Sequence, residues 1–363
     1  MTALLMIGTR KGLWLAQSDD DRQSWRLGHP HFFMQSIASC GIDKRGGRVR
    51  LLVGAHSEHW GPSVFHSDDL GASWQEPDGG AVRFPAEADT AVAAIWQLRP
   101  DTDGRRGVVW AGTEPSALWR STDGGETFAL VEGLWNHPHR PTWQPGGGGQ
   151  AIHTVLPHPG DDARILVAMS AGGVYVTDDG GGSWRPSNQG IKAYFLPDPW
   201  PEYGQCVHKV ARDAIDPQRL FAQNHHGVYR SDDGGSSWVS IAEGLPSDFG
   251  FPMVTHPAHP STAWTVPLVA DSQRVPPGEA LKVWRTSDGG ESWSPLSKGL
   301  PESGFYAAVL RDAFTSDDVA DPAGLYLGAR DGSVYASADE GETWNEVASH
   351  LPDVLCVRAA ALL

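Results

Sequence analysis

Four histidines are placed at the ends of predicted β-strands, in positions that would bring them to one end of the molecule. Two occupy matching places, His153 in Gln150-Ala-Ile-His-Thr-Val and His208 in Gln205-Cys-Val-His-Lys-Val. His56 and His225 end strands that run the opposite way, so they reach the same face. Neutral imidazole is the commonest metal ligand. We expect His56, His153, His208 and His225 to hold one transition metal, Zn or Fe; the alternative is a polar channel of hydrogen-bonded histidines and water.

Other polar side chains are predicted beside these histidines. Glu58 and Glu114 follow strands at the same end, and either could act as a metal ligand or a general base. The predicted substrate-binding residues are Arg10, His59, Tyr194 and Arg330. Arg10 and Arg330 could instead form surface ion pairs, and Tyr194 could instead fasten its loop to the face.

An eight-residue repeat indicates the elements that position these residues. The pattern is Ser/Thr-x-Asp-x-Gly-x-x-Trp/Phe, and six good copies occur at Ser67–Trp74, Ser121–Phe128, Thr177–Trp184, Ser231–Trp238, Thr286–Trp293 and Ser337–Trp344. A degraded copy at Ser18–Trp25 has Arg22 where glycine is expected. The copies start roughly 50 residues apart, the length of one four-stranded propeller blade with its loops.

Each part of the repeat has a structural role. The aspartate can accept hydrogen bonds from the backbone of a tight turn, the glycine supplies a positive φ, and the aromatic ring packs into the blade. Seven equivalent turns cannot all be one active site. We therefore interpret the repeated aspartates as structural, not catalytic.

The repeats predict an all-β fold, a seven-bladed β-propeller in one domain over residues 1–363. The first blade lacks one strand at the N-terminus, and the segment Val354–Leu362 has no blade of its own. We expect this C-terminal strand to complete the first blade and close the ring. The predicted blades are 1–28 with 353–363, 33–78, 91–133, 150–188, 205–244, 250–299 and 305–349.

The connections divide the two ends of the ring unequally. The repeats form turns at one end, whereas the long loops 133–150, 188–205 and 270–280 gather at the other. Long loops on a rigid scaffold are where binding residues concentrate. We expect the functional site on this loop-rich face, at the mouth of the central channel.

The repeats resemble those of the BNR or Asp-box propeller family. That family includes sialidases, sortilin-type receptors, xyloglucan-cleaving glycosidases and the photosystem II stability/assembly factor. The nearest likeness is to bacterial proteins labelled as glycosyl hydrolase-like, through segments such as Trp143–Gly149 and Gly204–Lys209. Sialidases use three arginines on a six-bladed ring. No such arginine triad can be chosen here, so we do not expect sialidase activity.

Composition excludes several partners. The formal net charge is −16 with no basic run, which argues against nucleic acid and against an anionic membrane surface. No apolar run is long enough to span a bilayer, and the N-terminus does not resemble a signal peptide. Three cysteines do not make a disulfide framework, so we expect a cytoplasmic protein. Cys206 is expected to point to the other side of its strand from His208, so we do not expect a Cys/His nucleophile pair.

Three functions remain open. The first is a metal-dependent hydrolase or lyase acting on a small molecule, with the four histidines as ligands. The second is a non-catalytic platform that binds a protein partner on the loop-rich face. The third is a metal-free glycoside hydrolase with two carboxylates chosen from Glu58, Glu114, Asp248 and Glu302. We rank them in this order.

Overall fold

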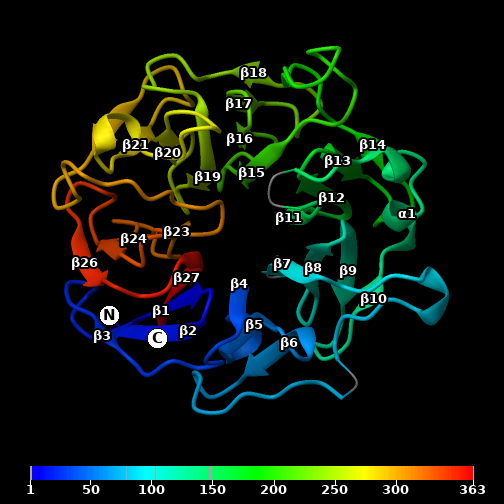
Figure 1. Ribbon diagram of the computed structural model, residues 1–363, viewed down its shortest axis with the longest axis horizontal. Helices are drawn as coiled ribbons and strands as arrows, with labels where there is room; N and C mark the ends of the chain where they lie inside the picture. The colour runs from blue at the N-terminus through cyan, green and yellow to red at the C-terminus, as the bar shows by residue number, and fades with distance from the viewer. Residues whose placement is uncertain (1, 79, 103, 147–148, 363) are drawn as a thin grey trace.

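Seven antiparallel β-sheets surround a central axis; the first strand of each sheet is innermost, except in the sheet that holds both chain ends, where β27 is (Figure 1). The computed structural model describes residues 2–78, 80–102, 104–146 and 149–362. The predicted seven-bladed β-propeller is confirmed. We number the blades in chain order and call their strands A to D from the axis outward.

The first three blades contain these strands. Blade 1 has β27 (Val354–Leu362), β1 (Thr2–Thr9), β2 (Gly12–Ser18) and β3 (Arg26–Leu27); blade 2 has β4 (Ser36–Asp43), β5 (Arg50–Ser57) and β6 (Gly61–Ser67); blade 3 has β7 (Ala94–Pro100), β8 (Val109–Glu114), β9 (Ala117–Ser121) and β10 (Ala129–Leu130). In blade 2 an isolated antiparallel bridge between His66 and Gln75 replaces the fourth strand.

The other four blades each have four strands. Blade 4 has β11 (Ile152–His158), β12 (Asp161–Met169), β13 (Gly173–Thr177) and β14 (Arg185–Pro186); blade 5 has β15 (Val207–Arg212), β16 (Leu220–Asn224), β17 (Val228–Ser231) and β18 (Val239–Ser240). Blade 6 has β19 (Phe249–Thr255), β20 (Ala263–Leu268), β21 (Val283–Thr286) and β22 (Ser294–Leu296); blade 7 has β23 (Phe314–Ser316), β24 (Leu325–Gly328), β25 (Val334–Ser337) and β26 (Asn345–Ala348).

Helices are short and lie in the connections. The helix α1 spans Glu132–Trp135, and 3-10 turns occur at Arg45–Gly47, Ala86–Ala88, Arg140–Thr142 and Pro277–Glu279. Among the described residues, no helix combines the length and the apolar character that crossing a bilayer would require.

The C-terminal strand closes the ring as predicted. β27 pairs antiparallel with β1, from Thr2 opposite Leu362 to Thr9 opposite Val354. The two ends of the chain therefore lie in one blade (Figure 1). This pairing covers the backbone edge of β1, which would otherwise be free to pair with another chain.

The repeated turns show the expected hydrogen bonds. In the copy of blade 2, Asp69 accepts bonds from the Ser67 hydroxyl at 2.7 Å and the Ser73 backbone at 2.9 Å. The Ser67 hydroxyl also accepts the Gly71 N–H, and Gly71 has a φ of +91°. The spacing of the motif thus follows from two side chains that hydrogen-bond the turn, Ser67 and Asp69, and from one glycine that tolerates a positive φ.

The degraded first copy keeps the same turn with an arginine. Arg22 adopts a φ of 69°, and its N–H bonds the Ser18 hydroxyl as glycine does elsewhere. Its guanidinium is buried and pairs with Asp317 of blade 7 at 3.1 Å. The substitution therefore adds a link between the first and last blades.

The aromatic residue of the repeat also joins neighbouring blades. The indole of Trp238 donates to the Ser187 carbonyl at 2.9 Å, and that of Trp293 donates to the Ile241 carbonyl at 2.8 Å. Each of these bonds reaches the preceding blade. Because each indole N–H has a hydrogen-bond acceptor, the ring can be buried between the blades without leaving an unpaired polar group.

Candidate functional site

A cavity of about 970 Å³ opens at the mouth of the central channel, on the loop-rich face. All seven blades contribute side chains to it, for example Arg10, His56, Trp96, Ser170, His208, Asp271 and Arg311 in blade order. The connections that follow blades 3 and 4 supply Gln144, Phe195, Glu202 and Tyr203. The location of the site at this end of the axis agrees with the expectation from the loops.

A shared backbone irregularity aims residues at this cavity. In blades 1 to 6, strand A carries a register shift against strand B near its cavity end. The residues skipped by the pairing include Leu355, Ala38, Trp96, His153, His208 and Phe251, and all of these except His153 line the cavity. A bulge of this kind turns a side chain out of the normal alternation.

His208 is held in one orientation and one tautomer. Its Nδ1 lies 2.6 Å from the Gly250 carbonyl, which can only accept, so Nδ1 carries the proton. Burial lowers the pKa of His208 well below its ordinary value, and the charge of Arg311 adds to this effect. His208 is therefore a neutral side chain whose Nε2 can accept a hydrogen bond.

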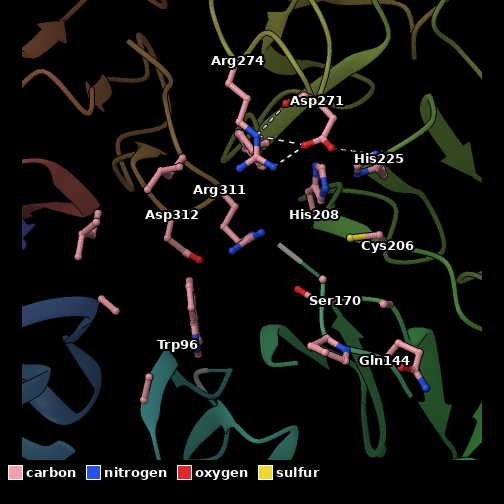
Figure 2. A pocket seen from close by; sticks show the side chains of 18 of the residues that line it. Trp96, Gln144, Ser170, Cys206, His208, His225, Asp271, Arg274, Arg311 and Asp312 are labelled. Atoms are coloured by element: carbon pink, nitrogen blue, oxygen red, sulfur yellow. Dashed lines mark hydrogen bonds and ion pairs between the residues drawn. The ribbon is translucent and has the colours of Figure 1, made fainter. Parts of the chain in front are cut away.

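Asp271 lies in the long loop of blade 6 and links two cavity residues. It accepts a bond from Arg274 Nε at 3.1 Å, and its Oδ2 lies 3.9 Å from His225 Nε2 (Figure 2). Burial lowers the pKa of His225, although the negative charge of Asp271 opposes that effect. The three side chains form one rim of the cavity.

The predicted four-histidine metal site is not assembled. His153 is enclosed behind the cavity, and neither of its ring nitrogens has a hydrogen-bond partner. His56 lines the cavity from blade 2. Among the described residues, it does not belong to the group of possible metal ligands that contains His208 and His225. The prediction failed because matching positions on a ring face the axis from different directions and do not meet at one point.

Cys206 joins His208 and His225 instead. Their possible ligand atoms all lie within 4.8 Å of one another. The expectation that Cys206 faces away from His208 is wrong, because residues two apart in an extended segment point to the same side, and both side chains line the cavity. These ligand types suit a transition metal. However, Arg311 and Arg274 create a positive field at His208, and such a field disfavours a cation.

The predicted catalytic carboxylates lie elsewhere. Glu58 is exposed in the turn between β5 and β6 and does not line the cavity. Glu114 ends β8 and accepts a bond from the Trp96 indole at 3.0 Å, behind the cavity wall. Glu114 thus positions Trp96 and does not face the open space.

The predicted substrate-binding residues divide into two groups. His59 is exposed outside the cavity, and Tyr194 packs against the ring of His226. Arg10 and Arg330 do line the cavity, but both are paired with Asp353, at 3.3 and 2.7 Å. The geometry therefore supports ion pairing for Arg10 and Arg330, the alternative to substrate binding.

The cavity carboxylates are Glu202, Asp271 and Asp312, none of which was chosen from the sequence. Asp312 is nearly enclosed and pairs with Lys209 and Arg358. Burial by itself would raise the pKa of Asp312, but these two cations outweigh burial and keep it below its ordinary value. The length of loop 270–280 could have pointed to Asp271 as a cavity residue. Arg311 and Asp312 gave no such signal, because they precede β23, a strand of three residues that the sequence pattern does not reveal.

Similar proteins come from two groups. No protein-family model matches the chain. It is 27% identical over 245 residues to the oligoxyloglucan-reducing end-specific xyloglucanase of Emericella nidulans, covering 59% of this chain and 29% of that enzyme. A Paenibacillus xyloglucanase is 26% identical, over 64% of this chain and 20% of its own length. The chain thus spans less than a third of these enzymes.

The second group consists of Ycf48 proteins. The photosystem II assembly lipoprotein Ycf48 of a Synechococcus species is 24% identical over 77% of this chain and 68% of its own length. Among solved structures, an ancestral GH74 enzyme superposes with a TM-score of 0.60 at 18% identity, over 86% of this chain and 38% of that one. Ycf48 bound to a D1 peptide gives 0.51 at 15% identity, over 86% and 82%. These structures show the shared fold.

The relatives overturn the first functional expectation. A metal-dependent hydrolase or lyase acting on a small molecule is contradicted, since the similar enzymes are xyloglucanases, which are glycoside hydrolases. The third expectation, glycoside hydrolysis by carboxylates, agrees better with these relatives.

Proposed function

We propose that this propeller binds a glycan in the axial cavity and hydrolyses a glycosidic bond there. The observation that carries the proposal is the presence of two accessible carboxylates, Glu202 and Asp271, in one cavity with flat aromatic rings. Glycoside hydrolysis generally needs one carboxylic acid to protonate the leaving oxygen and a second carboxylate to act as nucleophile or base. The similarity to xyloglucanases supports the same reaction class.

We assign the two roles by the surroundings of each group. Asp271 accepts a hydrogen bond from the Arg274 guanidinium, which holds its carboxylate in place at the cavity rim, so the proposal gives it the role of base or nucleophile. Glu202 comes from the connection between blades 4 and 5 and has no cation within ion-pair distance among the described residues, so the proposal gives it the role of proton donor. Asp312 is excluded because two cations already occupy its oxygens.

The rest of the cavity suits a sugar. Trp96, Phe251 and Tyr203 supply ring surfaces for the C–H face of a pyranose, and Ser170 and Gln144 supply hydrogen-bonding groups for its hydroxyls. His208 Nε2 can accept from a sugar hydroxyl because its Nδ1 proton is committed to Gly250. Apolar walls with a few fixed polar groups are typical of a small-ligand site.

The test is hydrolysis of a panel of xyloglucan oligosaccharides, aryl glycosides and aryl glucuronides. Asp271→Asn and Glu202→Gln should each lower kcat by roughly 10²- to 10⁴-fold, the usual contribution of a general acid or base. Glu58→Gln is the matched control, because Glu58 lies outside the cavity, and it should retain full activity. No cleavage of any substrate by the unmodified protein, or an equal loss in the Glu58 variant, would refute the proposal.

Peptide binding is the second candidate, and relative length favours it. The match covers 68% of the Ycf48 protein but only 20–29% of the first two xyloglucanases. Phe195, which is 47% exposed at the cavity, would then be a contact for a peptide side chain. A peptide array probed with the chain and with Phe195→Ala tests this: binding that the variant loses, with no glycan cleavage, supports the second candidate over the first.

A further inference from the structure

Arg311 is a cavity-lining cation without a counter-ion. Its Nε is enclosed with no hydrogen-bond partner, and among the described residues no carboxylate lies within ion-pair distance of its guanidinium. The other three arginines of the cavity are paired, Arg274 with Asp271, and Arg10 and Arg330 with Asp353. In a chain of net charge −16, an unpaired buried cation is costly unless a ligand neutralises it.

Aromatic rings fix the orientation of Arg311. Its guanidinium carbon lies 5.4 Å from the Trp96 ring centroid and 5.7 Å from that of Phe251. These rings belong to blades 3 and 6, so the side chain is held from two sides of the channel, between His208 and Trp96 (Figure 2). Contacts between the rings and the guanidinium face leave its N–H edge available.

Neighbouring anions are already committed. Asp312, the next residue, pairs with Lys209 at 2.8 Å and with Arg358. Asp271 pairs with Arg274. Neither carboxylate can pair with Arg311 without breaking an ion pair that it already forms. Glu202, the third cavity carboxylate, also lies outside ion-pair distance of Arg311 among the described residues, so the counter-charge is left to a ligand of the cavity.

We infer that the ligand of this cavity is an acidic saccharide whose carboxylate binds Arg311. A guanidinium edge presents parallel N–H donors that match the two oxygens of a carboxylate. The aromatic rings, His208 and Ser170 then contact the sugar that carries this group. The inference rests on the proposed function, and it names the substrate class as uronic-acid sugars.

Titration calorimetry with methyl β-glucuronide and methyl β-glucoside tests the inference, because the two probes differ only in the carboxylate. We expect the glucuronide to bind roughly 10- to 100-fold more tightly, the range for charge-assisted hydrogen bonds. Arg311→Gln should abolish this preference, and Arg311→Lys should keep only part of it. Arg10→Gln should retain it, because Arg10 is a cavity arginine with its own carboxylate partner. Equal melting temperatures establish that the variants are folded.

The outcomes separate the two proposals. Equal affinity for both probes, or a preference that persists in Arg311→Gln, overturns the acidic-sugar inference, and cleavage of neutral glycans would still support the proposed function. A preference that depends on Arg311 without any glycan cleavage supports the inference and overturns hydrolysis. Tighter binding of a methyl glucoside sulfate than of the glucuronide would overturn the assignment to a carboxylate.

Discussion

Lys209 Nζ lies 2.8 Å from Asp312 Oδ1, and this pair joins blade 5 to blade 7 at the central channel. Both side chains are largely enclosed, at 14% and 4% exposure. Arg358 of blade 1 contacts the same carboxylate. One aspartate oxygen therefore pairs with two cations from different blades, next in sequence to the cavity residue Arg311.

Asp312→Asn should destabilise the protein strongly, because it leaves Lys209 and Arg358 buried without a counter-charge. We expect a loss of about 3–5 kcal/mol in the free energy of unfolding at pH 7, measured by urea denaturation. Asp19→Asn is the control, since Asp19 pairs with Arg26 at the exposed surface and should change stability by less than about 1 kcal/mol. A loss no larger than that of the control would contradict this role for Asp312.

The same pair predicts a change at alkaline pH. Burial lowers the pKa of Lys209 to about 8 from its ordinary 10.5, although Asp312 opposes the shift. Between these values the unfolded chain binds more protons than the folded one, so the Lys209 contribution to stability rises with pH. Urea midpoints from pH 7.5 to 10.5 should show this rise, and Lys209→Met should remove it.

The repeated turns predict sensitivity to acid. Bonds from the Ser73 side chain and backbone lower the pKa of Asp69 to about 2, and Ser292 has the same effect on Asp288. A depressed carboxylate pKa stabilises the folded state above about pH 4, and this contribution is lost as the pH falls towards 2. Urea midpoints should therefore fall steeply below pH 4. A shallower fall is expected from pH 7 to 5, because burial lowers the pKa of His208 and His225 and the unfolded chain then binds more protons than the folded one.

Variants identify the source of that acid slope. Asp69→Asn should flatten the fall below pH 4, because one titrating turn is gone, while lowering the midpoint at pH 7. Glu302→Gln, a change at an exposed carboxylate, should leave both features as they are. An acid slope that is identical in the Asp69 variant would argue against the turns as its cause.

Cys206 offers a direct reporter of cavity occupancy. It lines the cavity, whereas Cys40 and Cys356 are fully buried. Burial raises the pKa of the Cys206 thiol, so it should react slowly with iodoacetamide at pH 7.5, yet before the other two. A saccharide bound in the cavity should slow the reaction further, as measured by mass spectrometry of the labelled protein.

Two results would contradict this prediction. The first is labelling of Cys40 or Cys356 ahead of Cys206 in the native protein. The second is an unchanged rate at Cys206 when a saccharide shown by calorimetry to bind is present at saturation. Cys206→Ser provides the background rate of the buried thiols.

The sequence alone determined the propeller. Each repeat forms its turn through hydrogen bonds within eight consecutive residues, as Asp69 with Ser67 and Ser73 demonstrates, so the pattern is readable without knowledge of distant contacts. The closure of the ring by β27 also followed from the sequence, because counting strands left one segment over and one blade incomplete. The loop-rich end was predictable from the lengths of the connections.

The composition of the site was decided only by the tertiary structure. His153 and His208 were correctly matched in sequence, yet one is enclosed and the other lines the cavity. Register shifts turn single residues such as Trp96 and His208 out of the regular alternation, and neither their presence nor their direction can be read from a strand pattern. Arg311 meets Trp96 of the distant blade 3 and Phe251 of the neighbouring blade 6 at the channel. Such a meeting depends on how the blades pack around the channel, which no local stretch of sequence encodes.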